Sequence, residues 1–95
     1  MELREIRQEI DTIDDQLVRL FCERMNLSAQ VADYKKEHNL PIYVPAREEE
    51  ILDSVAKIAG SELECYARSL YRKLFELSRA YQAARNDLAA QEVVK

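Results

Sequence analysis

An apolar repeat runs through the first 38 residues of this chain. Apolar side chains recur at alternating steps of three and four, at Leu3, Ile6, Ile10, Ile13, Leu17, Leu20, Leu27, Val31 and Tyr34. The register holds across the gap in this series when Arg24 is counted as a member. Because this spacing keeps one side of an α-helix apolar, the pattern predicts a single helix from about residue 3 to about residue 38.

The length of this helix constrains the whole fold. A helix of about 36 residues is about 54 Å long, because each residue adds about 1.5 Å. A compact domain of 95 residues has a radius of gyration near 12 Å and so a diameter of about 30 Å. The helix is therefore longer than its own domain, and its apolar side needs cover from outside the chain. Two-fold pairing with a second copy is the simplest solution, so we expect a homodimer.

The scarcity of turn-forming residues indicates that the rest of the chain is helical too. The chain has one Gly and two Pro, where average usage gives about seven and about five. Sheets and barrels need more turn residues than this. Asn39 and Pro41 are expected to end the first helix. Pro45 suits the first position of a second helix, over about 45–59, which ends at Gly60.

A third helix is predicted over about 62–88. Ser61 and Glu64 have the spacing of a capping box at its start. An apolar stripe follows, at Leu63, Tyr66, Leu70, Leu74, Leu77 and Tyr81. Residues 89–95 are weakly patterned and are expected to form a frayed tail. The predicted fold is therefore all-α: a single domain over residues 1–95 with a very long first helix, a short second and a long third, in an intertwined two-fold helical-bundle dimer.

Charge and composition narrow the classes of partner. The net charge of −4 argues against nucleic acid or an anionic membrane as the main partner. No stretch approaches the roughly 18 consecutive apolar residues of a membrane span, and the acidic, amphipathic N-terminus is unlike a signal sequence, so we expect a cytoplasmic protein. Cys22, Cys65 and the single histidine, His38, lack the spacing of a metal site, and no disulfide can be inferred from the two cysteines.

Arg24 stands out because it occupies a position of the apolar repeat. Burying an unpaired guanidinium is costly, so Arg24 needs an anionic partner. That partner is either an acid, such as Glu48 or Glu23 of a neighbouring molecule, or a bound anion. Lys35 lies almost three turns further on, on nearly the same face. Lys35 either compensates the helix dipole or joins Arg24 at an anion site.

Arg7 is a third cation on the first helix. It precedes Arg24 by 17 positions, which corresponds to about 25 Å along a helix. No small metabolite bridges that distance. Spacing alone favours a surface ion pair with Asp11. The alternative is that Arg7 reaches the site of the partner subunit across an antiparallel dimer.

The other candidate residues lie on the second and third helices. Ser78 and Gln82 are four positions apart, so they are neighbours on one face among apolar residues. The amide of Gln82 needs hydrogen-bond partners, and Ser78 is one candidate. Arg47 and Glu48 present a cation and an anion in the first turn of the second helix, as a surface pair or as part of a site.

In order and spacing, these residues resemble the all-helical class of chorismate mutase. The similar stretches are LREIRQEIDTIDDQLVRLFCERMNLSAQVADYKK, LPIYVPAREEEIL and YRKLFELSRAYQ. The resemblance implies the rearrangement of chorismate to prephenate in phenylalanine and tyrosine biosynthesis. This concerted reaction requires no cofactor, metal, nucleophile or proton transfer to the enzyme. It agrees with a sequence that offers no plausible catalytic Cys/His or Ser/His arrangement.

The resemblance also implies how the carboxylates of chorismate are bound. Arg24 and Arg47 of one chain, with Arg7 from the partner chain, are expected to bind the two carboxylates. Ser78 corresponds to a residue that helps at one of them. The site is therefore expected to be shared between two subunits.

The remaining implied roles concern the hydroxyl and the ether oxygen of chorismate. Glu48 matches the acid that binds the C4 hydroxyl. Lys35 and Gln82 match the pair that donates hydrogen bonds to the ether oxygen, where negative charge grows in the transition state. Val44 stands where some members carry aspartate, so only its backbone N–H can contribute.

Two other functions remain open at this point. An isochorismate-pyruvate lyase uses the same scaffold but lacks an acid at the position of Glu48, so this residue favours the mutase. A non-catalytic dimerisation module is the other alternative, in which Arg24 and Gln82 only fix the helix register. That alternative leaves the match of the other polar positions unexplained.

Overall fold

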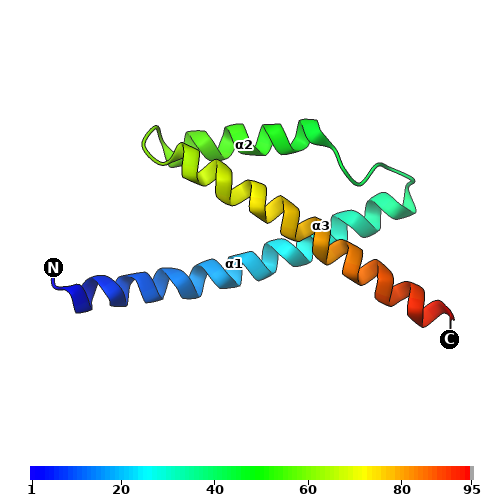
Figure 1. The fold of residues 1–95 in the computed structure, drawn as a ribbon, viewed down its shortest axis with the longest axis horizontal. Helices are drawn as coiled ribbons and strands as arrows, with labels where there is room; N and C mark the ends of the chain where they lie inside the picture. Colours follow the sequence, from blue (N-terminus) through cyan, green and yellow to red (C-terminus); the bar gives the residue numbers. More distant parts are fainter. Residues whose placement is uncertain (95) are drawn as a thin grey trace.

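The computed structural model of this chain consists of three helices (Figure 1). It describes the backbone of residues 1–94 and the side chains of residues 1–86. Helix α1 spans Leu3–Glu37, α2 spans Pro45–Ala59 and α3 spans Glu64–Val94. No strand occurs in residues 1–94, so the prediction of an all-α chain with three helices is confirmed.

The ends of α1 and the start of α2 follow local sequence signals. Asn39 adopts the left-handed conformation after α1, with φ of 56°, and the backbone N–H of Leu40 donates to the carbonyl of Lys35 at 2.8 Å. Such a bond satisfies a carbonyl that the helix itself leaves free. Pro45 begins α2, because proline has no N–H to lose and its fixed φ suits the first helical turn.

Helix α3 differs from its prediction at both ends. It begins at Glu64, because residues 61–63 form a turn in which the Gly60 carbonyl accepts from the N–H groups of Leu63 and Glu64. Ser61 makes no side-chain hydrogen bond within residues 1–86, so the predicted capping box is wrong. The helix also continues to Val94, so the expected tail from residue 89 is helical up to residue 94. The stretch AAQE contains good helix formers and no breaker, and Lys95 lies outside the described residues.

Helix α3 holds the fold together by packing on both other helices. It forms a hairpin with α2, and its middle crosses the second half of α1 (Figure 1). The buried apolar residues lie at these contacts, and they are Ala29, Leu52, Ala56 and Phe75. This core is small. Since burial of apolar surface is the main force that stabilises a domain, the chain gains little stability from its own core.

The first half of α1 extends well beyond the rest of the chain (Figure 1). The molecule measures 58 × 31 × 15 Å and has a radius of gyration of 17.2 Å, against about 12 Å for a compact domain of this size. The apolar residues of this half are open, with Ile13 58% and Leu17 56% exposed. The predicted overhang of the first helix is therefore present. Within the described residues, no helix has both the length and the apolar character needed to cross a membrane.

Replacing Gly60 with alanine is expected to lower the free energy of unfolding by about 1–3 kcal/mol. Gly60 has φ of 85° and ψ of 167°, a region open almost only to glycine. An added Cβ meets no atom within 4 Å, so the cost comes from the backbone alone. Urea unfolding of Gly60→Ala measures it, with Ser61→Ala in the same turn as a control. An unchanged free energy for Gly60→Ala would contradict the assigned conformation.

Candidate active site

A pocket of about 310 Å³ lies between the second half of α1, the 38–44 connection, the start of α2 and the middle of α3. Its volume is in the range of sites for small metabolites. The lining includes seven of the eight predicted site residues, namely Arg24, Lys35, Val44, Arg47, Glu48, Ser78 and Gln82. Residues from all three helices therefore converge at one place, which their separation in the sequence does not itself require.

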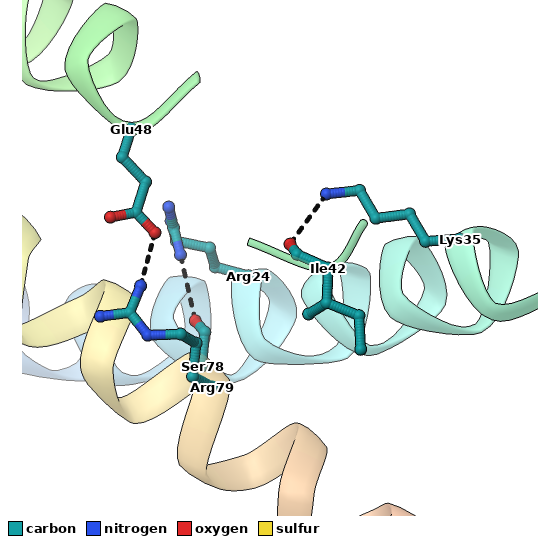
Figure 2. Close-up of polar contacts among 6 residues, drawn as sticks. All are labelled: Arg24, Lys35, Ile42, Glu48, Ser78 and Arg79. Atoms are coloured by element: carbon teal, nitrogen blue, oxygen red, sulfur yellow. Dashed lines mark hydrogen bonds and ion pairs between the residues drawn. The ribbon is translucent and has the colours of Figure 1, made fainter. Parts of the chain in front are cut away.

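Arg24 faces this pocket with only neutral partners. Its Nη1 donates to the hydroxyl of Ser78 at 3.5 Å (Figure 2). Its guanidinium lies over the rings of Tyr71 and Phe75, at 5.5 Å and 5.7 Å from their centroids. Within residues 1–86 no carboxylate forms an ion pair with Arg24, and the possible pairing with Glu48 is wrong. The positive charge of Arg24 is thus available to an anionic ligand.

Ser78 is the one buried polar residue of the described side chains, at 7% exposure. Its hydroxyl accepts from Arg24 and lies 3.6 Å from the sulfur of Met25. These contacts hold the hydroxyl beside the guanidinium. Ser78 therefore helps, together with the rings of Tyr71 and Phe75, to direct Arg24 toward the pocket.

Gln82 is held by α1 and not by its neighbour on α3. Its Nε2 donates to the carbonyl of Ser28 at 3.0 Å, so the expected hydrogen bond with Ser78 is absent. An amide nitrogen has two hydrogens. One serves Ser28 and orients the group, and the second remains for a ligand in the pocket.

Lys35 lines the pocket where α1 lies beside the 38–44 connection. Its Nζ donates to the carbonyl of Ile42 at 3.1 Å (Figure 2), which ties the 38–44 connection to α1. The ammonium group has three hydrogens, so further donors remain. Val44 follows in this connection, and its carbonyl accepts from the N–H groups of Arg47 and Glu48 at 3.1 Å and 3.3 Å. The backbone N–H of Val44 has no acceptor within residues 1–86 and can donate to a ligand.

Arg47 and Glu48 do not pair with each other. Arg47 lies 3.6 Å from Glu50 in an exposed contact within α2, a kind of pair that contributes about 0–1 kcal/mol. Arg47 is therefore free to turn to a ligand at little cost. Glu48 instead binds Arg79 of α3, whose Nη1 donates to its Oε2 at 2.5 Å (Figure 2).

Arg79 and Tyr43 are pocket residues that the sequence analysis did not identify. The guanidinium of Arg79 lies over the ring of Tyr43, 5.2 Å from its centroid, and both residues line the pocket. The position of Arg79, three residues before Gln82, places the two side chains on neighbouring parts of α3. That spacing is the signal that could have identified Arg79.

The pocket is strongly cationic. Its charged lining side chains are Arg24, Lys35, Arg47, Glu48 and Arg79, four cations against one anion, in a chain whose net charge is −4. Such a local excess of positive charge attracts a small anion with more than one negative charge. Within the described residues, no group of three or more His, Cys, Asp or Glu side chains is placed to hold a metal ion.

Arg7 is the predicted site residue that does not line the pocket. Helix α1 is continuous from Leu3 to Glu37, so Arg7 lies about 25 Å from Arg24. The side chains described include no ion pair between Arg7 and Asp11, so that surface pairing is wrong. Arg7 is exposed on the overhanging half of α1.

Comparison with known proteins relates this chain to one family. The profile of chorismate mutase type II matches residues 6–83. The bifunctional chorismate mutase/prephenate dehydratase of Aquifex aeolicus is 44% identical over 57 residues, which cover 60% of this chain and 16% of that protein. The chorismate mutase of Methanocaldococcus jannaschii is 40% identical over 83 residues, 85% of this chain and 84% of that protein.

A relative named for a different substrate and one solved structure are also similar to this chain. The 4-amino-4-deoxychorismate mutase of Streptomyces venezuelae is 33% identical over 59 residues, 62% of this chain and 57% of that protein. The structure of a chorismate mutase from Thermus thermophilus aligns with a TM-score of 0.75 at 28% identity, covering 80% of this chain and 96% of that one. The chain spans less than a fifth of the length of the Aquifex protein and of two further relatives, the T-proteins of Haemophilus influenzae and Enterobacter agglomerans. Since the family profile covers most of its residues, the chain belongs to the chorismate mutase type II family.

Proposed function

We propose that this protein is a chorismate mutase, which rearranges chorismate to prephenate in the pocket between its three helices. The observation that carries the proposal is the lining of the pocket, where four cations, one carboxylate and one amide surround a space of about 310 Å³. Chorismate has two carboxylates, a hydroxyl and an ether oxygen. For each of these groups the lining offers a side chain of opposite charge or a hydrogen-bond partner.

The two carboxylates of chorismate bind to arginines. Arg24 is already directed by Ser78, and Arg47 is held only by a weak surface contact. A guanidinium binds a carboxylate with two parallel hydrogen bonds, which fixes orientation as well as position. This clamp holds chorismate in the compact conformer from which the C–C bond forms.

Glu48 and the backbone N–H of Val44 bind the C4 hydroxyl. Glu48 accepts the hydroxyl hydrogen, and Val44 donates to the hydroxyl oxygen. The relative from Streptomyces venezuelae is named for a substrate with an amino group at C4. For this chain we assign the hydroxyl, because Glu48 is paired with the cation Arg79.

Lys35 and Gln82 carry the catalytic effect. The ether C–O bond breaks while the new C–C bond forms, and negative charge grows on the ether oxygen. Lys35 supplies a charged donor and Gln82 a neutral one, each held by a carbonyl in the resting protein. A preorganised donor of this kind contributes about 3–4 kcal/mol to the transition state.

The site is completed by a second copy of the chain. The overhanging half of α1 exposes its apolar side, and a groove of about 350 Å³ between α1 and α3 is lined mainly by Leu17, Leu20, Phe21, Leu70, Tyr71 and Leu74. A two-fold partner covers these surfaces and brings its own Arg7 to the pocket. This arrangement accounts for the distance between Arg7 and Arg24 within one chain.

The alternatives receive less support. A lyase of this scaffold lacks an acid where Glu48 stands, whereas here Glu48 lines the pocket. A pure dimerisation module gives no reason for six predicted polar residues to line one pocket. Both alternatives therefore leave observations unexplained that the mutase explains.

One experiment separates the three functions. The purified protein is incubated with chorismate and, separately, with isochorismate, and the products are identified by chromatography and mass spectrometry. We expect prephenate from chorismate. Salicylate and pyruvate from isochorismate, without prephenate from chorismate, would identify the lyase. No conversion and no binding of either compound would favour the dimerisation module.

A further inference from the structure

The ion pair between Glu48 and Arg79 bears on the choice of substrate. We propose that Arg79 positions Glu48 and makes the pocket select a neutral hydroxyl over a cationic ammonium at C4 of the substrate. This inference rests on the proposed function, in which Glu48 faces the C4 substituent. It adds a positioning residue that also determines specificity.

The geometry makes Arg79 a fixed partner of Glu48. The two residues are 31 positions apart on α2 and α3, and Nη1 of Arg79 lies 2.5 Å from Oε2 of Glu48 (Figure 2). The Glu48 side chain is 25% exposed and that of Arg79 44%. The ring of Tyr43 lies 5.2 Å from the guanidinium carbon and limits its movement on the other side. Arg79 is thereby held where it can direct one carboxylate oxygen into the pocket.

The hydrogen bonds of Glu48 leave one oxygen for a ligand. Oε2 accepts from Arg79, and Oε1 has no hydrogen-bond donor within residues 1–86. When a carboxyl group is ionised, its two oxygens accept hydrogen bonds and cannot donate them. A substrate hydroxyl therefore fits Oε1 as a donor, while its own oxygen remains free for the N–H of Val44.

The charge of Arg79 decides between hydroxyl and ammonium. A lone carboxylate attracts an ammonium more strongly than a neutral hydroxyl. A carboxylate paired with Arg79 has most of its charge compensated, and an ammonium at Oε1 also lies close to the guanidinium, which repels it. Arg24, Lys35 and Arg47 add to this repulsion from the same pocket. A repulsive element of this kind raises specificity without new contacts to the preferred substrate.

A purely structural role for the pair explains less. Ion pairs with this degree of exposure contribute little to stability, about 0–1 kcal/mol. Arg85 gives a comparison on the same helix, since it pairs with Asp33 at 3.5 Å and is 40% exposed, and its guanidinium lies 5.8 Å from the centroid of Tyr81. Arg85 does not line the pocket. The two arginines therefore share exposure, charge and stacking, and differ in their contact with Glu48.

The test compares chorismate with its 4-amino-4-deoxy analogue by kcat/KM. In the Arg79→Gln variant we expect the preference for chorismate to fall at least about tenfold, with a lower KM for the analogue. Arg79→Lys restores the charge and is expected to keep most of the preference. Arg85→Gln is the matched control and should leave the ratio of the two kcat/KM values unchanged. If Arg79→Gln does not fold, Arg79→Met provides a second variant that removes the positive charge and keeps the aliphatic part of the side chain.

The outcomes distinguish the inference from the function on which it rests. An active Arg79→Gln or Arg79→Met enzyme whose preference stays within about twofold of the wild type would overturn the role of Arg79 and leave the mutase intact. An equal fall of the ratio in Arg85→Gln would also overturn it, because the effect would then come from net charge. A wild-type protein that converts neither compound would overturn the proposed function itself.

Discussion

Lys35→Ala is expected to lower kcat by about 10²- to 10³-fold while KM changes by less than about threefold. The ether oxygen of chorismate carries little charge in the ground state and gains negative charge as the C–O bond breaks. A donor placed there stabilises the transition state more than the bound substrate. In the resting protein the Lys35 ammonium is held by the carbonyl of Ile42 at 3.1 Å, so it is already in place when the substrate enters.

The matched control for this prediction is Lys36→Ala. Lys36 stands next in α1, is exposed and does not line the pocket, so its loss removes the same charge without the same contact. We expect kcat of Lys36→Ala to stay within about twofold of the wild type. Steady-state kinetics on chorismate measures both variants, and circular dichroism checks that both are helical. A nearly normal kcat for Lys35→Ala would remove Lys35 from the mechanism.

Mixing two inactive variants is expected to restore activity. In the proposed homodimer, Arg7→Ala and Arg24→Ala are each expected to damage both sites, because every site would use Arg24 of one chain and Arg7 of the other. In a heterodimer of the two variants, one site carries both changes and the other carries neither. With random exchange, half of the dimers are mixed, so about a quarter of the wild-type activity should return.

The control for complementation uses two variants from the same part of the site. Arg24 and Lys35 line the pocket of one chain, so a mixture of Arg24→Ala and Lys35→Ala leaves a defect in every site and should restore nothing. Subunit exchange is driven by brief denaturation and refolding, and the mixed dimers are verified by differently tagged chains. If verified heterodimers of Arg7→Ala and Arg24→Ala stay inactive, Arg7 does not act across the dimer.

Much of the fold follows from local signals in the sequence. The apolar repeat and the stops at Asn39 and Pro41 define α1, which ends at Glu37, one residue before the predicted end. Pro45 and Gly60 bound α2 in the same way. The start of α3 was placed two residues early, because the turn after Gly60 is stabilised by backbone hydrogen bonds that a side-chain capping pattern does not reveal.

The site was predicted as a set of residues but not as a set of contacts. Arg24 and Lys35 could be identified because residues of one helix share a face according to the helical period. Their partners could not be identified in this way. Arg24 donates a hydrogen bond to Ser78, 54 positions away in the sequence. Gln82 donates one to the carbonyl of Ser28, at the same separation in the sequence.

The sequence alone thus determined that this protein is a chain of three helices whose first member is too long for one compact domain. The reason is that helix length and amphipathic periodicity are local properties, fixed by residues within one or two turns of each other. The tertiary structure decided which polar groups meet, above all that Glu48 binds Arg79 and not Arg24 or Arg47. Such pairings depend on where α3 crosses α1 and on how each helix is rotated, and these are set by the packing of side chains from distant parts of the chain.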